Sequence, residues 1–348
     1  MNIHLTKSQI GLDGVPAAET VLSHVDGERG ELIIAGEHVG TLASQSSFEG
    51  VTARLWNGAS KTTLSEANVR ASLGAARERA FARLPELLPA TRGMGIVDWF
   101  RAAVAGLRAE NGLEHEATIV GAFPVIAGAL VRRTKGLEPV APDPHASHAA
   151  DTLRMLRGAS PEPREVAALD AYLVTVCDHG MNASTFTTRV VASTQADLFA
   201  AVTAGYCALT GPLHGGAPEP VLEMLDAIGS SERIKPWVDA ALARGERLMG
   251  FGHRVYRVRD PRADVLKAAI ERLSADGADL PFAGSRPISA ARCARRIRTG
   301  RWRRTWSSSW RFCSMLSPFH ARPSRRSSPW RVQRDGPPMR ASNSGRGG

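Results

Sequence analysis

Residues 164–184 read REVAALDAYLVTVCDHGMNAS, and this stretch decides the fold class. Its large apolar residues recur at steps of three and four, which is the spacing of one buried helix face. They are Val166, Leu169, Leu173 and Val176. Ser160 and Pro161 precede this periodic segment, and we expect them to be its N-terminal cap and first-turn residue. The helix should end just before His179, which stands in a break of small and polar residues.

The same helical spacing continues on the C-terminal side of this stretch. A helix is predicted over 198–209, between a Thr194–Asp197 capping box and Gly211-Pro212. A second is predicted over 221–228 and ends at Gly229. A third runs from Asp260-Pro261 through Leu273. Only residues 31–40 alternate between apolar and polar types, which predicts a short hairpin. The pattern therefore predicts an all-α fold.

Charge divides the chain into two parts. Residues 1–284 carry 28 Lys and Arg against 33 Asp and Glu, a net charge of −5. Residues 285–348 carry 16 Arg, no Lys and one acid, a net charge of +15, with four of the seven Trp. The total of +10 alone would indicate a nucleic-acid binder. The division instead indicates a mildly acidic protein followed by a foreign, basic tail.

Length and composition exclude several other classes. A chain of 348 residues with 43% hydrophobic residues suffices for about two domains with a sizeable core. The uncharged stretches 117–131 and 198–218 are too short, or too broken by Pro and Gly, to be predicted as membrane spans. The N-terminus shows no secretory signal, and the four cysteines lack the paired spacing of a zinc site or disulfide framework. We expect a soluble cytoplasmic protein without a metal.

Three histidines stand in breaks between predicted helices. His179 follows the first helix, His214 lies in Gly-Pro-Leu-His-Gly-Gly, and His253 lies in Met-Gly-Phe-Gly-His-Arg. Each alone is most often a polar loop residue, and no pair has the spacing of a zinc-binding helix. Arginines follow His253 at 254, 257, 259 and 262, and guanidinium groups match the geometry of carboxylates and phosphates. Together these residues indicate a helical enzyme that acts on small anions.

Five motifs in register resemble the citrate synthase family over nearly all of residues 8–284. They are Gly-Leu-Asp-Gly-Val at 11–15, Pro-Asp-Pro at 142–144 with His148, His-Gly-Met-Asn-Ala-Ser-Thr at 179–185, Gly-Pro-Leu-His-Gly-Gly at 211–216, and Gly-Phe-Gly-His-Arg at 250–254 with Asp-Pro-Arg at 260–262. The resemblance implies a mostly helical homodimer with its active site in a cleft between two domains. We expect a large domain at 1–216, the start of a small domain at 217–284, and an aberrant tail at 285–348.

The resemblance also implies a reaction and a role for each matching residue. The reaction is the condensation of acetyl-CoA with oxaloacetate, and 2-methylcitrate synthesis from propionyl-CoA is the alternative that the sequence leaves open. His214 would hydrogen-bond the thioester carbonyl, and His253 would be the general acid toward oxaloacetate. His179 and Arg262 would bind the oxaloacetate carboxylates. Coenzyme A would lie along Gly250, Phe251, Gly252 and Arg257. No permanently bound cofactor is implied, because acetyl-CoA is a co-substrate.

The tail departs from the family pattern. The family has a catalytic carboxylate about fifty residues after the position of His253 and a substrate-binding arginine later, and neither segment occurs here. Asp335 is the only acid after residue 284. Read one frame over, the codons for 305–309 permit Val-Glu-Phe-Phe, and those for 331–343 permit Arg-Ala-Ala-Gly-Trp-x-Ala-His. Both resemble the missing segments, so we infer a frameshift near residue 285.

Two consequences follow for function. An out-of-frame tail would be disordered, would bind nucleic acid only non-specifically, and would leave the chain impaired as a catalyst because the base is missing. The competing hypothesis is a non-catalytic protein whose Arg- and Trp-rich tail binds nucleic acid through phosphate contacts and base stacking.

Overall fold

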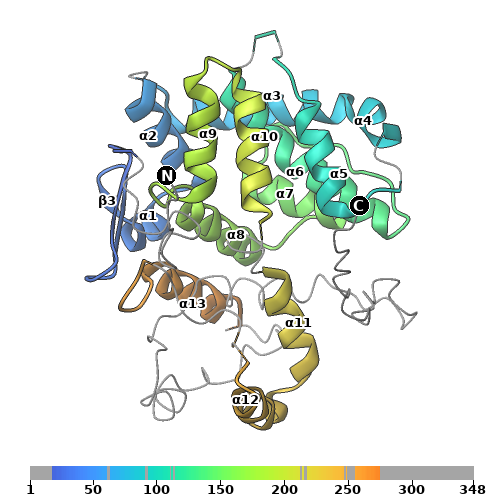
Figure 1. The fold of residues 1–348 in the computed structure, drawn as a ribbon. Helices are drawn as coiled ribbons and strands as arrows, with labels where there is room; N and C mark the ends of the chain where they lie inside the picture. The colour runs from blue at the N-terminus through green and yellow to red at the C-terminus, as the bar shows by residue number, and fades with distance from the viewer. Residues whose placement is uncertain are drawn as a thin grey trace, which may run out of the picture.

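The computed structural model describes residues 18–274, apart from 61–62, 91–92, 110, 113, 212–213, 215–217, 247 and 249–254 (Figure 1). The lead-in motif at 11–15 and the tail at 285–348 lie outside the described residues. The predictions of a frameshifted and disordered tail therefore stay predictions.

Helices dominate the described residues, which confirms the all-α prediction. They are α1 (Val39–Gln45), α2 (Phe48–Ser60), α3 (Glu66–Ala82), α4 (Leu84–Ala90), α5 (Ile96–Ala105), α6 (His115–Thr134), α7 (His148–Arg157), α8 (Pro163–Val176), α9 (Ala183–Ser193), α10 (Leu198–Leu209), α11 (Pro218–Ile228), α12 (Ile234–Ala243) and α13 (Pro261–Ser274), with the 3-10 turn η2 (Ser231–Arg233) before α12. The strands are β1 (Ser23–Asp26), β2 (Glu31–Ile34) and β3 (Glu37–His38).

The predicted hairpin is present as β2 and β3, which pair antiparallel. Ala35 and Gly36 form its turn with φ of 48° and 85°, the left-handed values that a tight hairpin turn requires. The structure adds β1, which pairs with the other edge of β2. Val39 already belongs to α1, so the hairpin is shorter than the predicted 31–40.

Two predicted helix starts are wrong. Glu162, not Ser160, is the N-cap of α8, because it forms a reciprocal capping box with Glu165 and is followed by Pro163 in the first turn. Asp197 caps α10 directly, since its carboxylate accepts the backbone N–H of Ala200 at 2.8 Å. Thr194, predicted as that cap, instead ends α9.

The buried face of α8 also differs from the predicted one. Of the four predicted apolar positions only Leu169 is buried, and Val176 is 38% exposed. The most buried positions are smaller residues, among them Ala168, Ala171 and Val174. Because α8 packs against α7, α1 and α13 on different sides, its core is not a single stripe of large residues.

The remaining helix predictions are confirmed. Helix α10 covers the predicted 198–209, and α11 ends at Gly229, whose φ of +73° suits a helix C-terminus. Helix α13 begins at Pro261 as predicted and buries Leu266, Ala269 and Leu273.

Helix α6 is the centre of the main body. By length and composition it could cross a membrane, but 61% of its apolar window is buried inside the fold. Helices α3, α5, α7 and α10 pack around it, and its Val125, Ile126 and Leu130 belong to the largest apolar cluster. Its burial identifies α6 as a core helix.

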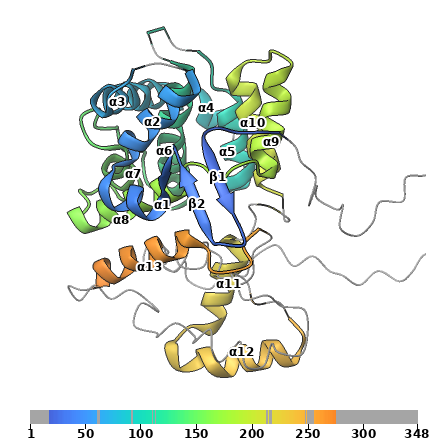
Figure 2. The same cartoon turned by 90° about the vertical axis from the view of Figure 1, so that its left-hand side faces the viewer.

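Helices α11 and α12 lie apart from this main body in two views (Figures 1 and 2), whereas α13 lies against it. Helices α11 and α12 share an apolar cluster that includes Val221 and Leu225, with Trp237 packed against it. Helix α13 packs on α8, where Ala168 joins Ala269 and Leu273. The chain thus has a second helical core after residue 217, and the division into large and small domains stays a prediction.

Candidate active site

The loop between α8 and α9 carries His179. Gly180 turns the chain with φ of +64°, and its backbone N–H donates to the Asp178 carboxylate at 2.8 Å. The same N–H lies 3.1 Å from the Ser23 hydroxyl of strand β1. A side chain at Gly180 would be strained by the positive φ and would press on Val25. The β1–β2 hairpin therefore holds the loop that carries His179.

His179 contacts Tyr256, which lies 77 residues later in the sequence. Its Nε2 atom is 3.1 Å from the Tyr256 hydroxyl, and the two rings meet edge to face with centroids 5.6 Å apart. Tyr256 has no exposed surface. Burial, with the nearby Asp260 carboxylate, raises the pKa of the Tyr256 hydroxyl well above its ordinary value. The phenol therefore keeps its proton at neutral pH.

Arg262 is held by Asp260. Its Nε and Nη2 atoms reach the two carboxylate oxygens at 3.1 and 2.8 Å. Asp260 is fully buried, whereas the Arg262 side chain is 11% exposed. The pair uses two of the five N–H donors of the guanidinium. This geometry fixes the orientation of Arg262 at the start of α13.

His214 contacts the first turn of α9. Its Nε2 atom lies 3.3 Å from the Ser184 backbone nitrogen and 2.9 Å from the Ser184 hydroxyl. Asn182 caps this helix by accepting the Thr185 N–H at 3.0 Å, and its side-chain oxygen lies 2.8 Å from the Ser184 hydroxyl. The single hydroxyl proton of Ser184 can go to Asn182 or to His214, but the backbone N–H of Ser184 can only donate. That N–H therefore favours the tautomer in which His214 Nε2 accepts and Nδ1 carries the proton.

Arg257 lies against the turn between β1 and β2. Its backbone N–H donates to the Gly27 carbonyl at 2.8 Å, and its guanidinium is 3.8 Å from the exposed Glu28 carboxylate. A Cβ at Gly27 would overlap the backbone of Val255. The hairpin that holds the His179 loop thus also holds the segment that carries Tyr256.

The structure therefore brings the predicted residues together in part. His179 is linked through Tyr256 to the segment of Arg257 and Arg262, and His214 lies against the helix that follows His179. His253, Gly250, Phe251 and Gly252 lie outside the described residues, so their roles stay predictions.

Sequence reasoning quoted Ser184 and Asp260 within motifs without giving them a role, and it passed over Tyr256 and Ser23. The contacts of Ser184, Tyr256 and Ser23 join segments distant in the sequence, so no local pattern marks them, whereas Asp260 pairs with Arg262 two residues later. The described part of the chain holds no group of three or more His, Cys, Asp or Glu residues that could bind a metal.

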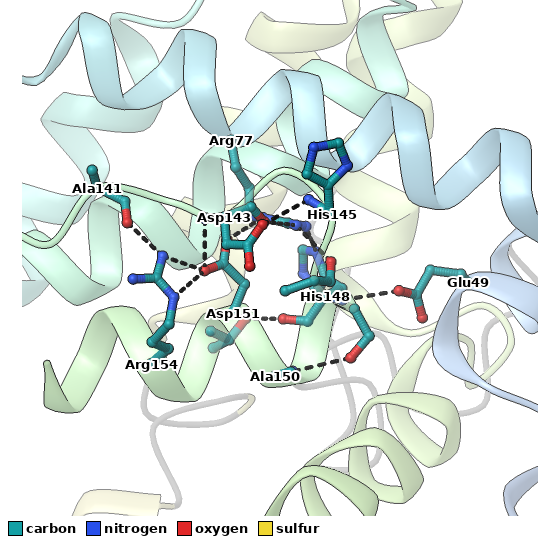
Figure 3. Close-up of polar contacts among 12 residues, drawn as sticks. Glu49, Arg77, Ala141, Asp143, His145, His148, Ala150, Asp151 and Arg154 are labelled. Carbon is teal, nitrogen blue, oxygen red and sulfur yellow. Dashed lines mark hydrogen bonds and ion pairs between the residues drawn. The ribbon is translucent and has the colours of Figure 1, made fainter. Parts of the chain in front are cut away.

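A second polar cluster, the α7 network, lies inside the main body (Figure 3). Arg77 of α3 is fully buried and donates from Nε to Asp151 of α7 at 2.6 Å. Its Nη2 atom donates to the carbonyls of Asp143 and Ala146, and its Nη1 atom is 3.5 Å from His148 Nδ1. The motif at 142–148 therefore receives a structural role, because its loop wraps around one buried guanidinium.

The rest of the α7 network closes around the same helix. The second Asp151 oxygen accepts the Asp143 N–H and the Arg154 guanidinium. Glu49 of α2 is fully buried and accepts the backbone N–H of His148 at 2.9 Å. Burial and the Arg77 charge lower the pKa of His148 to about 3, so its ring is neutral at neutral pH.

Comparison with known proteins gives the family. A family model described as "Citrate synthase, C-terminal domain" matches residues 11–291. A citrate synthase of Mycolicibacterium smegmatis is 37% identical over 280 residues, which cover 76% of this chain and 73% of that protein. A 2-methylcitrate synthase of Mycobacterium tuberculosis is 37% identical over 276 residues, which cover 76% and 69%.

A solved structure agrees with these sequence relatives. The citrate synthase of Thermoplasma acidophilum, in a ternary complex with carboxymethyl coenzyme A and oxaloacetate, has a TM-score of 0.74 and 25% identity. The similarity covers 90% of this chain and 85% of that one. With a family match over most of its length and relatives above one third identity, the chain belongs to the citrate synthase family of acyltransferases.

Proposed function

We propose that this protein is built to condense acetyl-CoA with oxaloacetate, giving citrate and free CoA. The observation that carries the proposal is the pairing of His214 with the first turn of α9, beside the loop of His179. That pairing leaves a proton on His214 Nδ1, which suits a donor to the thioester carbonyl. Family membership supports the same reaction.

In the proposed mechanism, the carboxylate base of the frame-corrected chain takes an α-proton from the acetyl thioester, which becomes its enolate with negative charge on the thioester oxygen. His214 Nδ1–H donates to that oxygen, where a fixed donor lowers the barrier most. The enol carbon attacks the keto carbon of oxaloacetate, and His253 gives a proton to the keto oxygen. Water then cleaves the thioester of the condensed product and releases the CoA thiol.

The oxaloacetate carboxylates would be bound by His179 and Arg262. Support comes from the Asp260 pair, which fixes one edge of the guanidinium and leaves donors for a second carboxylate. Coenzyme A would lie along Gly250, Phe251, Gly252 and Arg257, as the family resemblance implies.

The chain as written should turn over poorly. Asp335 is the only acid after residue 284, and the family match ends at residue 291, close to the change in composition. A missing general base typically costs about 10²–10⁴-fold in rate. Resequencing the DNA around codons 280–290 should show an inserted or deleted base.

The test of the reaction is release of free thiol. The frame-corrected protein should release CoA only when oxaloacetate is present, and the 348-residue chain should be far slower. Propionyl-CoA in place of acetyl-CoA tests 2-methylcitrate synthesis, which the equal identity to a 2-methylcitrate synthase keeps as the second candidate. No thiol release with either acyl-CoA would contradict both.

We also propose that two copies of the chain associate through α9, α10 and the start of α5. Helix α9 buries none of its residues, and Val190 and Leu209 are 48% and 43% exposed. A pocket of about 290 Å³ lies between α9, α10 and α6, and its lining includes the apolar side chains of Phe123, Val202 and Leu209. Such an exposed apolar surface is typical of an interface.

Sedimentation tests this association. Val190→Asp should convert a dimer to a monomer, because a charge would be buried at the contact. Leu137→Asp is the control, since Leu137 is equally exposed but lies after α6. A wild-type chain that sediments as a monomer would contradict the proposal.

A further inference from the structure

The contact between His179 and Tyr256 is more than packing. Tyr256 has no exposed surface, so its only polar atom must find its partner inside the protein. The hydroxyl lies 3.1 Å from His179 Nε2. Six residues later comes Arg262, whose partner Asp260 is also buried. One short segment thus carries both a contact to His179 and the neighbouring arginine.

The β1–β2 hairpin contacts both this segment and the loop that carries His179. Ser23 of β1 contacts the Gly180 N–H, and Gly27 accepts the Arg257 N–H. Backbone contacts this close leave little freedom to either segment. Because the hairpin holds both the His179 loop and the segment of Tyr256, it sets the distance between the two side chains.

The chemistry of the pair gives it a direction. Burial and Asp260 raise the pKa of the Tyr256 hydroxyl, so the phenol stays protonated and has a proton that it can donate to His179 Nε2. A neutral imidazole accepts such a proton at Nε2 only when its own proton is on Nδ1. In that arrangement Nδ1–H is the donor on the opposite side of the His179 ring.

We propose that Tyr256 is a positioning residue for oxaloacetate binding, which holds His179 in the Nδ1-protonated tautomer and aligned with the Asp260–Arg262 pair. This inference rests on the proposed function, because it takes oxaloacetate as the ligand of His179 and Arg262. Tyr256 itself does not touch the substrate. It acts by fixing which nitrogen of His179 donates.

The test is Tyr256→Phe in the full chain, which removes one hydroxyl and keeps the buried ring. Oxaloacetate affinity, measured by calorimetry, should fall about tenfold, because His179 loses the partner that orients it. Tyr172→Phe is the matched control, since Tyr172 is half-buried on α8 in a different apolar cluster. Its oxaloacetate affinity should equal that of the wild type.

A spectroscopic readout tests the positioning without any substrate. In ¹⁵N-histidine spectra the His179 ring, assigned from a His179→Gln variant, should show protonated Nδ1 in the wild type and a mixture of tautomers in Tyr256→Phe. A wild-type ring protonated at Nε2, or ring signals unchanged in Tyr256→Phe, would overturn the inference even if the variant folds poorly.

The two proposals fail in different ways. If the wild-type chain binds oxaloacetate and Tyr256→Phe binds it equally well, the role of Tyr256 is overturned and the proposed function stands. If the wild-type chain binds no oxaloacetate, the proposed ligand is wrong and the inference about oxaloacetate falls with it. The ring signals then still decide whether Tyr256 sets the His179 tautomer.

Discussion

The α7 network and the candidate active site are built from the same types of side chain, and they differ in how much of each side chain is exposed to solvent. In the α7 network, Arg77 and Asp151 are fully buried, and all three guanidinium nitrogens of Arg77 contact protein atoms. In the candidate site, Arg262 is 11% exposed and gives two N–H groups to Asp260. The guanidinium contacts of Arg77 are all internal, which indicates a structural role, whereas we propose that the partly exposed Arg262 binds a ligand.

The histidines repeat this contrast. His148 is buried among α2, α3 and α7 and stays neutral because Arg77 and burial disfavour its charge. His179 and His214 are half-buried at helix ends, and the Nε2 atom of each contacts a neighbouring side chain. We propose that these partly exposed rings, unlike that of His148, face a substrate. Changes to the α7 network should therefore lower stability, and changes at the candidate site should lower ligand affinity.

The largest effect is expected for Arg77→Met. Removing the guanidinium leaves Asp151 buried without its closest partner, and such a loss typically costs about 3–5 kcal/mol in the free energy of unfolding. Urea denaturation would measure it. Arg79→Met is the control, because Arg79 is an exposed arginine on the same helix. A loss at Arg77 below about 1 kcal/mol would show that the α7 network does not hold α3 to α7.

A pH effect should follow from His148. Its folded pKa of about 3 lies below the unfolded value of 6.5, so the unfolded state binds the proton first as the pH falls. Stability from this group is therefore present above pH 6.5 and is lost between about pH 6.5 and 3, by on the order of 5 kcal/mol.

The measurement is the difference in unfolding free energy between wild type and His148→Gln across that pH range. Because the carboxylates titrate in both proteins, the difference isolates His148. His38→Gln is the control at an exposed histidine. A difference that does not vary with pH would mean that His148 is not a neutral, buried ring.

Helix periods were readable from the sequence because they depend on neighbouring residues. The breaks at His179 and His214 were visible for the same reason. The start of α8 was misplaced because Glu162 and Glu165 cap each other reciprocally, and glutamate is a less common cap than the serine at 160.

Contacts across the fold were not readable. Arg77 reads as one of many charges in α3, and its burial depends on a loop about seventy residues later. Tyr256 lies among arginines in the sequence, and only the structure brings it to His179. The sequence thus predicts where the candidate active site lies, whereas the partners that orient its side chains come from tertiary packing.

At the candidate site, Arg262→Lys should separate affinity from stability. Lysine keeps a positive charge near Asp260 but loses the planar fork that binds two carboxylates at once. Oxaloacetate affinity should fall about ten- to hundredfold, while the unfolding free energy changes by less than about 1 kcal/mol. Arg259→Lys is the control, because Arg259 is exposed and pairs with Asp264. A stability loss as large as that of Arg77→Met would erase the contrast between the two clusters.

The smallest effect is expected for Ser184→Ala, which tests the orientation of His214. The substitution removes the hydroxyl 2.9 Å from His214 Nε2 and leaves the backbone N–H in place, so the ring should be held less firmly. A hydrogen bond to the thioester carbonyl is available to acetyl-CoA and not to free CoA. The preference for acetyl-CoA over CoA, measured from the two dissociation constants, should therefore shrink about fivefold, in line with the loss of one neutral hydrogen bond. Ser193→Ala makes the same change at the far end of α9, where the hydroxyl contacts only the helix backbone, and should leave the preference unchanged. An equal preference in Ser184→Ala and wild type would mean that the Ser184 backbone N–H alone orients His214. The main chain would then hold the candidate active site as rigidly as side chains hold the α7 network.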